Sequence, residues 1–136
     1  MVLDTSVCVD LLREAARKET GPAHRALKGV EEVRVYLTLF SVCELYTGIY
    51  LSRQPEGEQA RVQSFIQHLT VLDPNVSFPI LYGEAAAGLL SRGTPIPVMD
   101  LLIGITAKAH GLPVLTRDPT HFRRIPGLTV QSYPTD

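Results

Sequence analysis

The chain has 136 residues, the length of one domain, and its 45% hydrophobic content is typical of a folded globular protein. Its formal net charge of −1 excludes a protein that holds nucleic acid through a broad basic surface. No apolar run is long enough to span a membrane, and none has the pattern of a signal peptide. Cys8 and Cys43 lack metal-ligand spacing, so we expect two buried thiols in a cytoplasmic protein.

Short apolar runs alternate with segments of helical periodicity along the whole chain. The runs predict strands over Met1–Leu3, Val33–Leu39, Val71–Leu72, Pro113–Leu115 and Leu128–Ser132. The periodic segments predict helices from near Val7, over Ala23–Lys28, from Ser41 to Leu51, and over Glu58–His68, Pro79–Ser91, Val98–His110 and Thr120–Arg124. This alternation indicates an α/β fold of three layers, in which helices flank a mostly parallel central sheet. We expect residues 1–136 to form a single domain.

Local signals place the ends of several helices. Thr5 or Ser6 is expected to cap the first helix, whose Asp10 and Glu14 would face water, and Ser41 is expected to cap the helix after the second strand. Glu44 would then lie in or near the first turn of that helix, where the positive helix end favours an anion. The polar turn Arg53–Gly57 separates two helices that we expect to protrude as a pair.

Four acids stand at matching places in this pattern. Asp4 and Asp118 each follow an apolar strand. Asp100 opens a buried helix, and Glu44 lies near the start of another helix. In a parallel sheet these places lie on one edge, where ligands bind, so we expect the four carboxylates to converge. Taken singly, each acid has an ordinary explanation as a helix cap, a solvated first-turn residue or a turn initiator.

A converging set of carboxylates needs a counterion. Two carboxylates about 4 Å apart repel by roughly 4 kcal/mol at an effective dielectric constant of about 20. Only Arg117 adjoins one of the four acids in the sequence, and no His or Cys has zinc-site spacing. Oxygen ligands alone favour Mg²⁺ or Mn²⁺. Such a site activates water for attack on a phosphoryl group, so the residues indicate phosphodiester hydrolysis.

Several stretches resemble the PIN-domain family and, within it, the VapC-type toxin ribonucleases of type II toxin–antitoxin pairs. The stretches are Val2–Val7, Val42–Gly48, Pro97–Ile103 and Gly111–Phe122, the last followed by Ile125–Leu128. They keep the family's order from end to end of the chain. The resemblance implies a compact PIN-like fold and a metal-dependent endoribonuclease that cuts RNA, with tRNA and rRNA among the family's substrates.

The resemblance also implies roles for particular residues. The catalytic, metal-binding acids would be Asp4, Glu44, Asp100 and Asp118, with Asp4 and Asp100 the firmest ligands of Mg²⁺ or Mn²⁺. The hydroxyls that support these acids or contact the phosphate would be those of Thr5, Ser6 and Thr116. It further implies a homodimer and an antitoxin protein that grips the helix pair around Arg53–Gly57. Gly104 departs from the family, which usually has Ala there, and is expected to loosen its helix.

Other functions stay open at this point. A PIN-like module could hold RNA or a protein without cutting, although such modules tend to lose one or more acids. A phosphotransfer protein fits less well, since Ser6 replaces the second Asp of aspartyl-phosphate phosphatases and Arg117 stands where receivers have Lys. His121 lies beside Asp118 and is a candidate general acid, which a metal mechanism does not require. The candidates for contacts to an RNA backbone are Arg13, Arg17, Arg117, Arg123 and Arg124.

Overall fold

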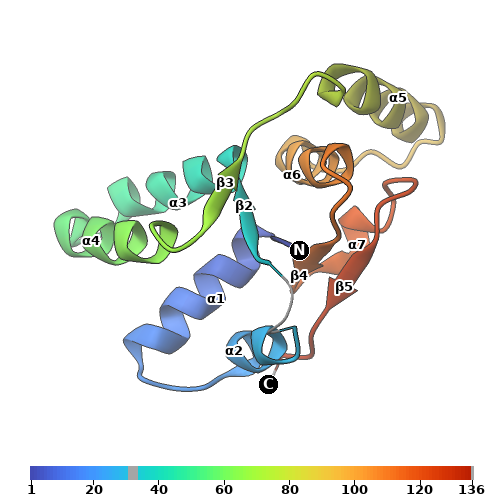
Figure 1. Ribbon diagram of the computed structural model, residues 1–136. Helices are drawn as coiled ribbons and strands as arrows, with labels where there is room; N and C mark the ends of the chain where they lie inside the picture. Colours follow the sequence, from blue (N-terminus) through green and yellow to red (C-terminus); the bar gives the residue numbers. More distant parts are fainter. Residues whose placement is uncertain (31–33, 136) are drawn as a thin grey trace.

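The computed structural model describes residues 1–30 and 34–135. Within these residues the strands form one sheet in the order β3-β2-β1-β4-β5, and every pairing is parallel. The strands are β1 (Val2–Leu3), β2 (Tyr36–Thr38), β3 (Thr70–Leu72), β4 (Val114–Thr116) and β5 (Val130–Ser132). The predicted α/β fold with a parallel sheet is confirmed, and the first strand is the central one (Figure 1).

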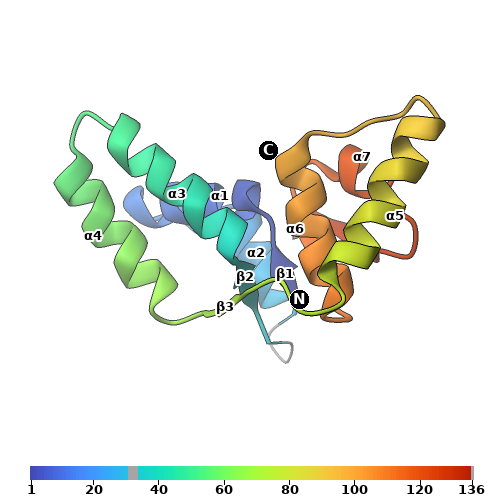
Figure 2. The ribbon, with the colours of Figure 1, turned by 90° about the horizontal axis from the view of Figure 1, so that it is seen from above.

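Helices cover both faces of the sheet. One face carries α1 (Thr5–Ala16), α2 (Pro22–Lys28), α3 (Leu39–Leu51) and α4 (Pro55–Ile66). The other carries α5 (Phe78–Ser91), α6 (Val98–Ala109) and α7 (Pro119–Phe122). Figure 2 shows α3 and α4 on one side of the sheet and α5 and α6 on the other. No helix in the described part of the chain is long and apolar enough to cross a membrane.

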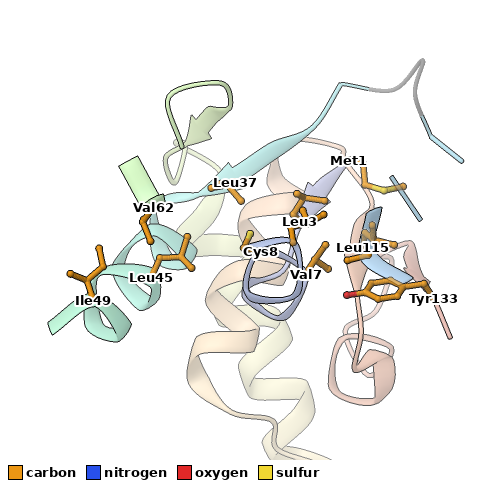
Figure 3. Packing of buried hydrophobic residues seen from close by; sticks show 12 residues of the cluster. Met1, Leu3, Val7, Cys8, Leu37, Leu45, Ile49, Val62, Leu115 and Tyr133 are labelled. Carbon is orange, nitrogen blue, oxygen red and sulfur yellow. The ribbon is translucent and has the colours of Figure 1, made fainter. Parts of the chain in front are cut away.

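Each central strand contributes side chains to both hydrophobic cores. Met1 and Leu3 pack in the core beneath α1–α4, whereas Val2 packs in the core beneath α5–α7. The strand β4 divides in the same way, with Leu115 in the first core and Val114 in the second. Successive strand residues point to opposite faces, so continuous apolar runs fill two cores at once. Figure 3 shows Met1, Leu3 and Leu115 gathered in the first core.

Two helices begin earlier than predicted because the last residue before each one is its cap. The cap of α1 is Asp4, which accepts the backbone N–H of Thr5 at 2.7 Å, and neither Thr5 nor Ser6 caps it. The cap of α3 is Thr38, whose side chain accepts the N–H of Ser41 at 3.1 Å. Ser41 is therefore not the cap, and Glu44 lies beyond the first turn. In both places the strand passes into the helix with no intervening loop.

Other local expectations also need correction. The helix α4 begins at Pro55 and not at Glu58, since proline suits the first helical position. Cys43 is exposed, whereas Cys8 is buried as expected. The predicted second strand begins at Val33, which lies outside the described residues, and the observed strand begins at Tyr36.

Glu14 joins α1 to α2. The prediction that its side chain faces water is therefore wrong. Its carboxylate accepts the N–H of Ala23 at 3.0 Å and that of His24 at 3.1 Å, and it lies 2.8 Å from Nδ1 of His24. The cap position of α2 is Gly21, where a Cβ would come within 2.5 Å of the Glu14 carboxyl carbon. Burial acts to raise the pKa of Glu14, but the hydrogen bonds from His24 and Ala23 lower it below its ordinary value.

Gly104 lies at a close contact between α6 and the segment after α7. A Cβ at this position would lie 2.5 Å from Cδ1 of Ile125, 3.3 Å from Cδ2 of Leu128 and 3.4 Å from Cδ1 of Phe122. Phe122 and Ile125 are both almost fully buried. The glycine therefore has a packing role that the sequence did not predict, because its partners follow it by 18 residues or more.

The Gly104→Ala substitution should lower stability through this contact. Alanine raises helix propensity by about 1 kcal/mol, but overpacking costs about 1–3 kcal/mol. Ile125→Val removes Cδ1, so it should lower the free energy of unfolding less in the Gly104→Ala background than in the wild type. Urea unfolding of the two single variants and the double variant should give a coupling energy of about 1 kcal/mol. Equal costs of Ile125→Val in both backgrounds would contradict a direct contact.

Glu14 should make stability depend on pH in the acid range. A group whose folded pKa lies below its unfolded value of about 4.3 contributes stability above that value and loses it as the pH falls. Glu14→Gln should lower the free energy of unfolding by about 1–3 kcal/mol at pH 7. The difference from the wild type should narrow in urea unfolding below about pH 4. A difference that is constant across this range would show that the carboxylate charge is irrelevant.

Candidate active site

A crevice lies at the point where the strand order of the sheet reverses, between β1 and β4. After β1 the chain adds β2 and β3 on one side, and it then returns to place β4 and β5 on the other. The helices that follow β1 and β4, which are α1 and α7, pack in different cores on opposite faces. Ligands of open parallel sheets bind at such a reversal, beyond the carboxyl ends of the two strands. Asp4 follows β1 and Asp118 follows β4, so both acids lie at this crevice.

Three of the four predicted acids line one pocket at this place. The pocket has a volume of about 550 Å³ and is lined by Asp4, Asp100, Asp118, Thr120, His121 and Phe122. Asp100 comes from the first turn of α6, where the positive end of the helix favours an anion. Strand ends and a helix start thus bring together residues that are far apart in the sequence.

Asp4 is buried and held by several hydrogen bonds. Its Oδ1 accepts the backbone N–H of Thr5, and its Oδ2 accepts the hydroxyls of Ser6 at 2.8 Å and Thr116 at 2.9 Å. Burial raises the pKa of Asp4, and the charge of Asp100 acts in the same direction, while the hydrogen bonds oppose both effects. The net pKa lies above the ordinary value, so a nearby cation would stabilise the ionised carboxylate.

The hydroxyls of Ser6 and Thr116 connect the ends of β1 and β4. Besides donating to Asp4, the Ser6 oxygen accepts the N–H of Arg117 at 3.2 Å, and the Thr116 oxygen accepts the N–H of Asp118 at 3.1 Å. The two hydroxyl oxygens lie 3.4 Å apart. These contacts fix the two strand exits relative to each other, and with them the acids on both sides of the crevice.

Glu44 lies in the second turn of α3 and is joined to the site through Thr5. The Thr5 hydroxyl lies 2.6 Å from Oε1 of Glu44, to which it donates, and 3.1 Å from the Ser41 hydroxyl. Glu44 borders a groove of about 340 Å³ between α1, α3 and α4, and is absent from the lining of the pocket that holds Asp4. Burial raises the pKa of Glu44, and the charges of Asp4 and Asp100 raise it further, against the Thr5 hydrogen bond.

Asp4, Glu44 and Asp100 are therefore close enough to interact electrostatically, but the four acids do not form a compact ligand set. As placed in the described residues, no three His, Cys, Asp or Glu side chains are arranged to hold a metal ion. Three carboxylates share the pocket, and Glu44 approaches from the neighbouring groove. The convergence predicted from the sequence is seen for Asp4, Asp100 and Asp118, and Glu44 differs because its helix begins at Leu39.

Asp118 is exposed and lies beside an anchored arginine. Its side chain is 73% exposed, and its Oδ2 lies 3.5 Å from Nε of Arg117. The Arg117 guanidinium also contacts Oδ1 of Asp10 at 2.7 Å, and Tyr133 donates its hydroxyl to Oδ2 of Asp10 at 2.8 Å. The prediction that Asp10 faces water is therefore wrong. Periodicity cannot reveal this network, because Asp10 is more than 100 residues from both Arg117 and Tyr133.

His121 contacts Asp100 directly. The Nδ1 atom of its ring lies 2.9 Å from Oδ2 of Asp100, and the two side chains are 43% and 26% exposed. Sequence reasoning singled out His121 only as a neighbour of Asp118 and did not pair it with Asp100. The start of α6 and the short helix α7 lie side by side only in the folded chain.

Known proteins of similar sequence support the family resemblance. The family model described as PIN domain matches residues 1–128. The chain is 31% identical to the tRNA(fMet)-specific endonuclease VapC of Salmonella typhimurium over 97% of this chain and 96% of that protein. It is 26% identical to Ribonuclease VapC2 of Rickettsia felis over the same shares of the two chains.

Solved structures agree in fold. The DNA-bound VapBC structure from Salmonella typhimurium contains a chain that superposes with a TM-score of 0.84 at 31% identity, over 96% of both chains. The VapBC2 structure from Rickettsia felis, bound to a promoter DNA fragment, gives a TM-score of 0.86 at 24% identity over 98% of both chains. With a family model that spans nearly the whole sequence and relatives that align from end to end, the chain belongs to the PIN-domain family.

Proposed function

We propose that this chain is an endoribonuclease toxin of the VapC type, formed by a single PIN-like domain, that hydrolyses RNA phosphodiester bonds with Mg²⁺ or Mn²⁺. The observation that carries the proposal is the pocket between the ends of β1 and β4, which Asp4, Asp100 and Asp118 line together. The names of the relatives, a tRNA endonuclease and a ribonuclease, support RNA as the substrate.

The donor chemistry of the site fits a hard divalent cation. All four acids offer oxygen, and the pKa values of Asp4 and Glu44 are raised first by burial and then by the negative charge of neighbouring acids. Mg²⁺ and Mn²⁺ prefer oxygen ligands, and Mg²⁺ keeps several waters, so it needs only one or two direct carboxylates. When bound, the ion would act as a Lewis acid toward water and the scissile phosphate. We assign Asp4 and Asp100 as its principal ligands, with Glu44 and Asp118 completing the acidic site.

The hydroxyl residues have a supporting role in this proposal. The single protons of Ser6 and Thr116 are donated to Asp4, and that of Thr5 is donated to Glu44. These hydroxyls therefore orient the acids and have no proton left to donate to a phosphate. Because Asp4 accepts three hydrogen bonds, its carboxylate is held in one orientation before any ligand arrives.

We also propose a protein antitoxin as partner and a homodimer as the assembled state. The solved relatives are described as VapBC proteins, and one of them as a member of the VapBC family of toxin–antitoxin systems. The α3–α4 pair projects from the sheet (Figure 1), and α4 borders an apolar groove of about 600 Å³ with α1 and α2, which supports this face as the antitoxin site. Exposed apolar side chains around α5 and the start of α6, at Val76, Ile80, Leu90 and Val98, support a second interface.

Replacing the principal acids should abolish cleavage while the fold survives. Asp4→Asn and Asp100→Asn should each reduce RNA cleavage at least about 100-fold, since loss of residues that merely support a metal ligand already costs about 10–100-fold. Asp73→Asn is a matched control, because Asp73 directly follows β3 at the same edge of the sheet but lies outside the pocket. Circular dichroism should show that all three variants are folded. Full activity of either pocket variant would contradict the proposal.

Removal of divalent ions should stop cleavage reversibly. Protein treated with a chelator and then dialysed should not cut a tRNA pool, and added Mg²⁺ or Mn²⁺ should restore cutting, since oxygen donors select these ions. The measurement is the appearance of new RNA ends by gel electrophoresis. Cleavage by metal-free protein would refute metal dependence, whereas RNA binding without cleavage under any metal would favour a non-catalytic PIN module.

A further inference from the structure

We propose that His121 is a positioning residue for Asp100: its Nδ1–H donates to Oδ2 and orients the carboxylate toward the cation. The inference rests on the proposed function, because it gives His121 a task at the proposed metal site. The contact joins Nδ1 and Oδ2 at 2.9 Å, and both residues line the pocket that also holds Asp4 and Asp118.

Asp100 depends on this contact more than Asp4 depends on any one of its own. Asp4 is fixed by a backbone N–H and two hydroxyls. In the described part of the chain, His121 is the one residue that forms a hydrogen bond with the Asp100 carboxylate. A partly exposed carboxylate in the first turn of a helix has several rotamers, and a single donor to one oxygen selects among them. The other oxygen then stays available as a ligand.

The packing of α7 against α6 brings the imidazole to Asp100. Gly104 follows Asp100 by four residues on α6, so the two lie on the same face one turn apart. With no side chain at Gly104, Ile125 and Phe122 pack directly onto this face. Phe122 is 1% exposed, and it anchors the short helix that carries His121. The lack of a side chain at Gly104 thus belongs to the arrangement that places His121.

The identity of the ring nitrogen makes the inference testable by conservative substitution. Asn reaches as far from Cβ as Nδ1 of His, and its amide can donate a proton from nearly the same point. Gln places its amide near the position of Nε2 instead. If Nδ1–H orients Asp100, Asn should replace His121 and Gln should not.

The experiment measures Mn²⁺ affinity directly, by the electron paramagnetic resonance signal of free Mn²⁺ in a titration of the full chain without RNA. His121→Gln should weaken Mn²⁺ binding about 10-fold or more, as the loss of residues that orient a metal ligand generally does. His121→Asn should bind nearly as well as the wild type. His68→Gln is the matched control, because His68 is an exposed histidine two residues after α4 and outside the pocket lining. Thermal unfolding should confirm that each variant is folded.

The outcomes separate this inference from the proposed function. Unchanged affinity in His121→Gln would overturn the positioning role, and tighter binding would overturn it as well, since the imidazole would then compete with the cation. Equal losses in His121→Asn and His121→Gln would also overturn the assignment to Nδ1. The Asp100→Asn variant completes the set: if it binds Mn²⁺ like the wild type, the proposed metal site itself is wrong, whereas weakened binding there with unchanged binding in His121→Gln refutes only the role of His121.

Discussion

The burial of carboxylates close to one another is the constraint that the rest of the crevice must satisfy. Burial and the charge of Asp100 both raise the pKa of Asp4, and the same causes act on Glu44. Gathering acids in a partly desolvated place is unfavourable unless donors or a cation offset their charge. The chain supplies donors to each acid separately: a backbone N–H and two hydroxyls for Asp4, a hydroxyl for Glu44 and an imidazole for Asp100.

The strand order of the sheet brings these donors within hydrogen-bonding distance of the acids. The reversal of strand order at β1 puts the exits of β1 and β4 next to each other. Thr116 ends β4 and donates to Asp4, which follows β1, so the shared hydrogen bond exists only with this strand order. The cores on the two faces then hold α1 and α7 in place, since Val7 and Phe122 are fully buried in different clusters. Packing far from the pocket thus determines the positions of its polar groups.

The sequence predicted the arrangement of elements better than the contacts at the site. Alternating apolar runs and helical segments are local signals, and they predicted a mostly parallel sheet and the succession of strands and helices along the chain. The positions of Asp4, Asp100 and Asp118 at strand and helix ends followed from the same signals. The pairing of His121 with Asp100, and of Arg117 with Asp10 and Tyr133, joins segments that touch only in the folded chain. No periodicity in a single sequence carries that information.

The difference in the start of α3 changes the physical account of Glu44. With Ser41 as cap, Glu44 would lie near the helix N-terminus, whose partial positive charge lowers the pKa of a carboxylate. Thr38 is the cap instead, so Glu44 lies in the second turn, beyond the range where that charge acts strongly. Its pKa is accordingly raised, first by burial and then by Asp4 and Asp100, and only the Thr5 hydroxyl opposes these effects. Glu44 therefore has one hydroxyl donor to offset these effects. A cation in the pocket would stabilise its ionised form through space even though Glu44 borders the neighbouring groove.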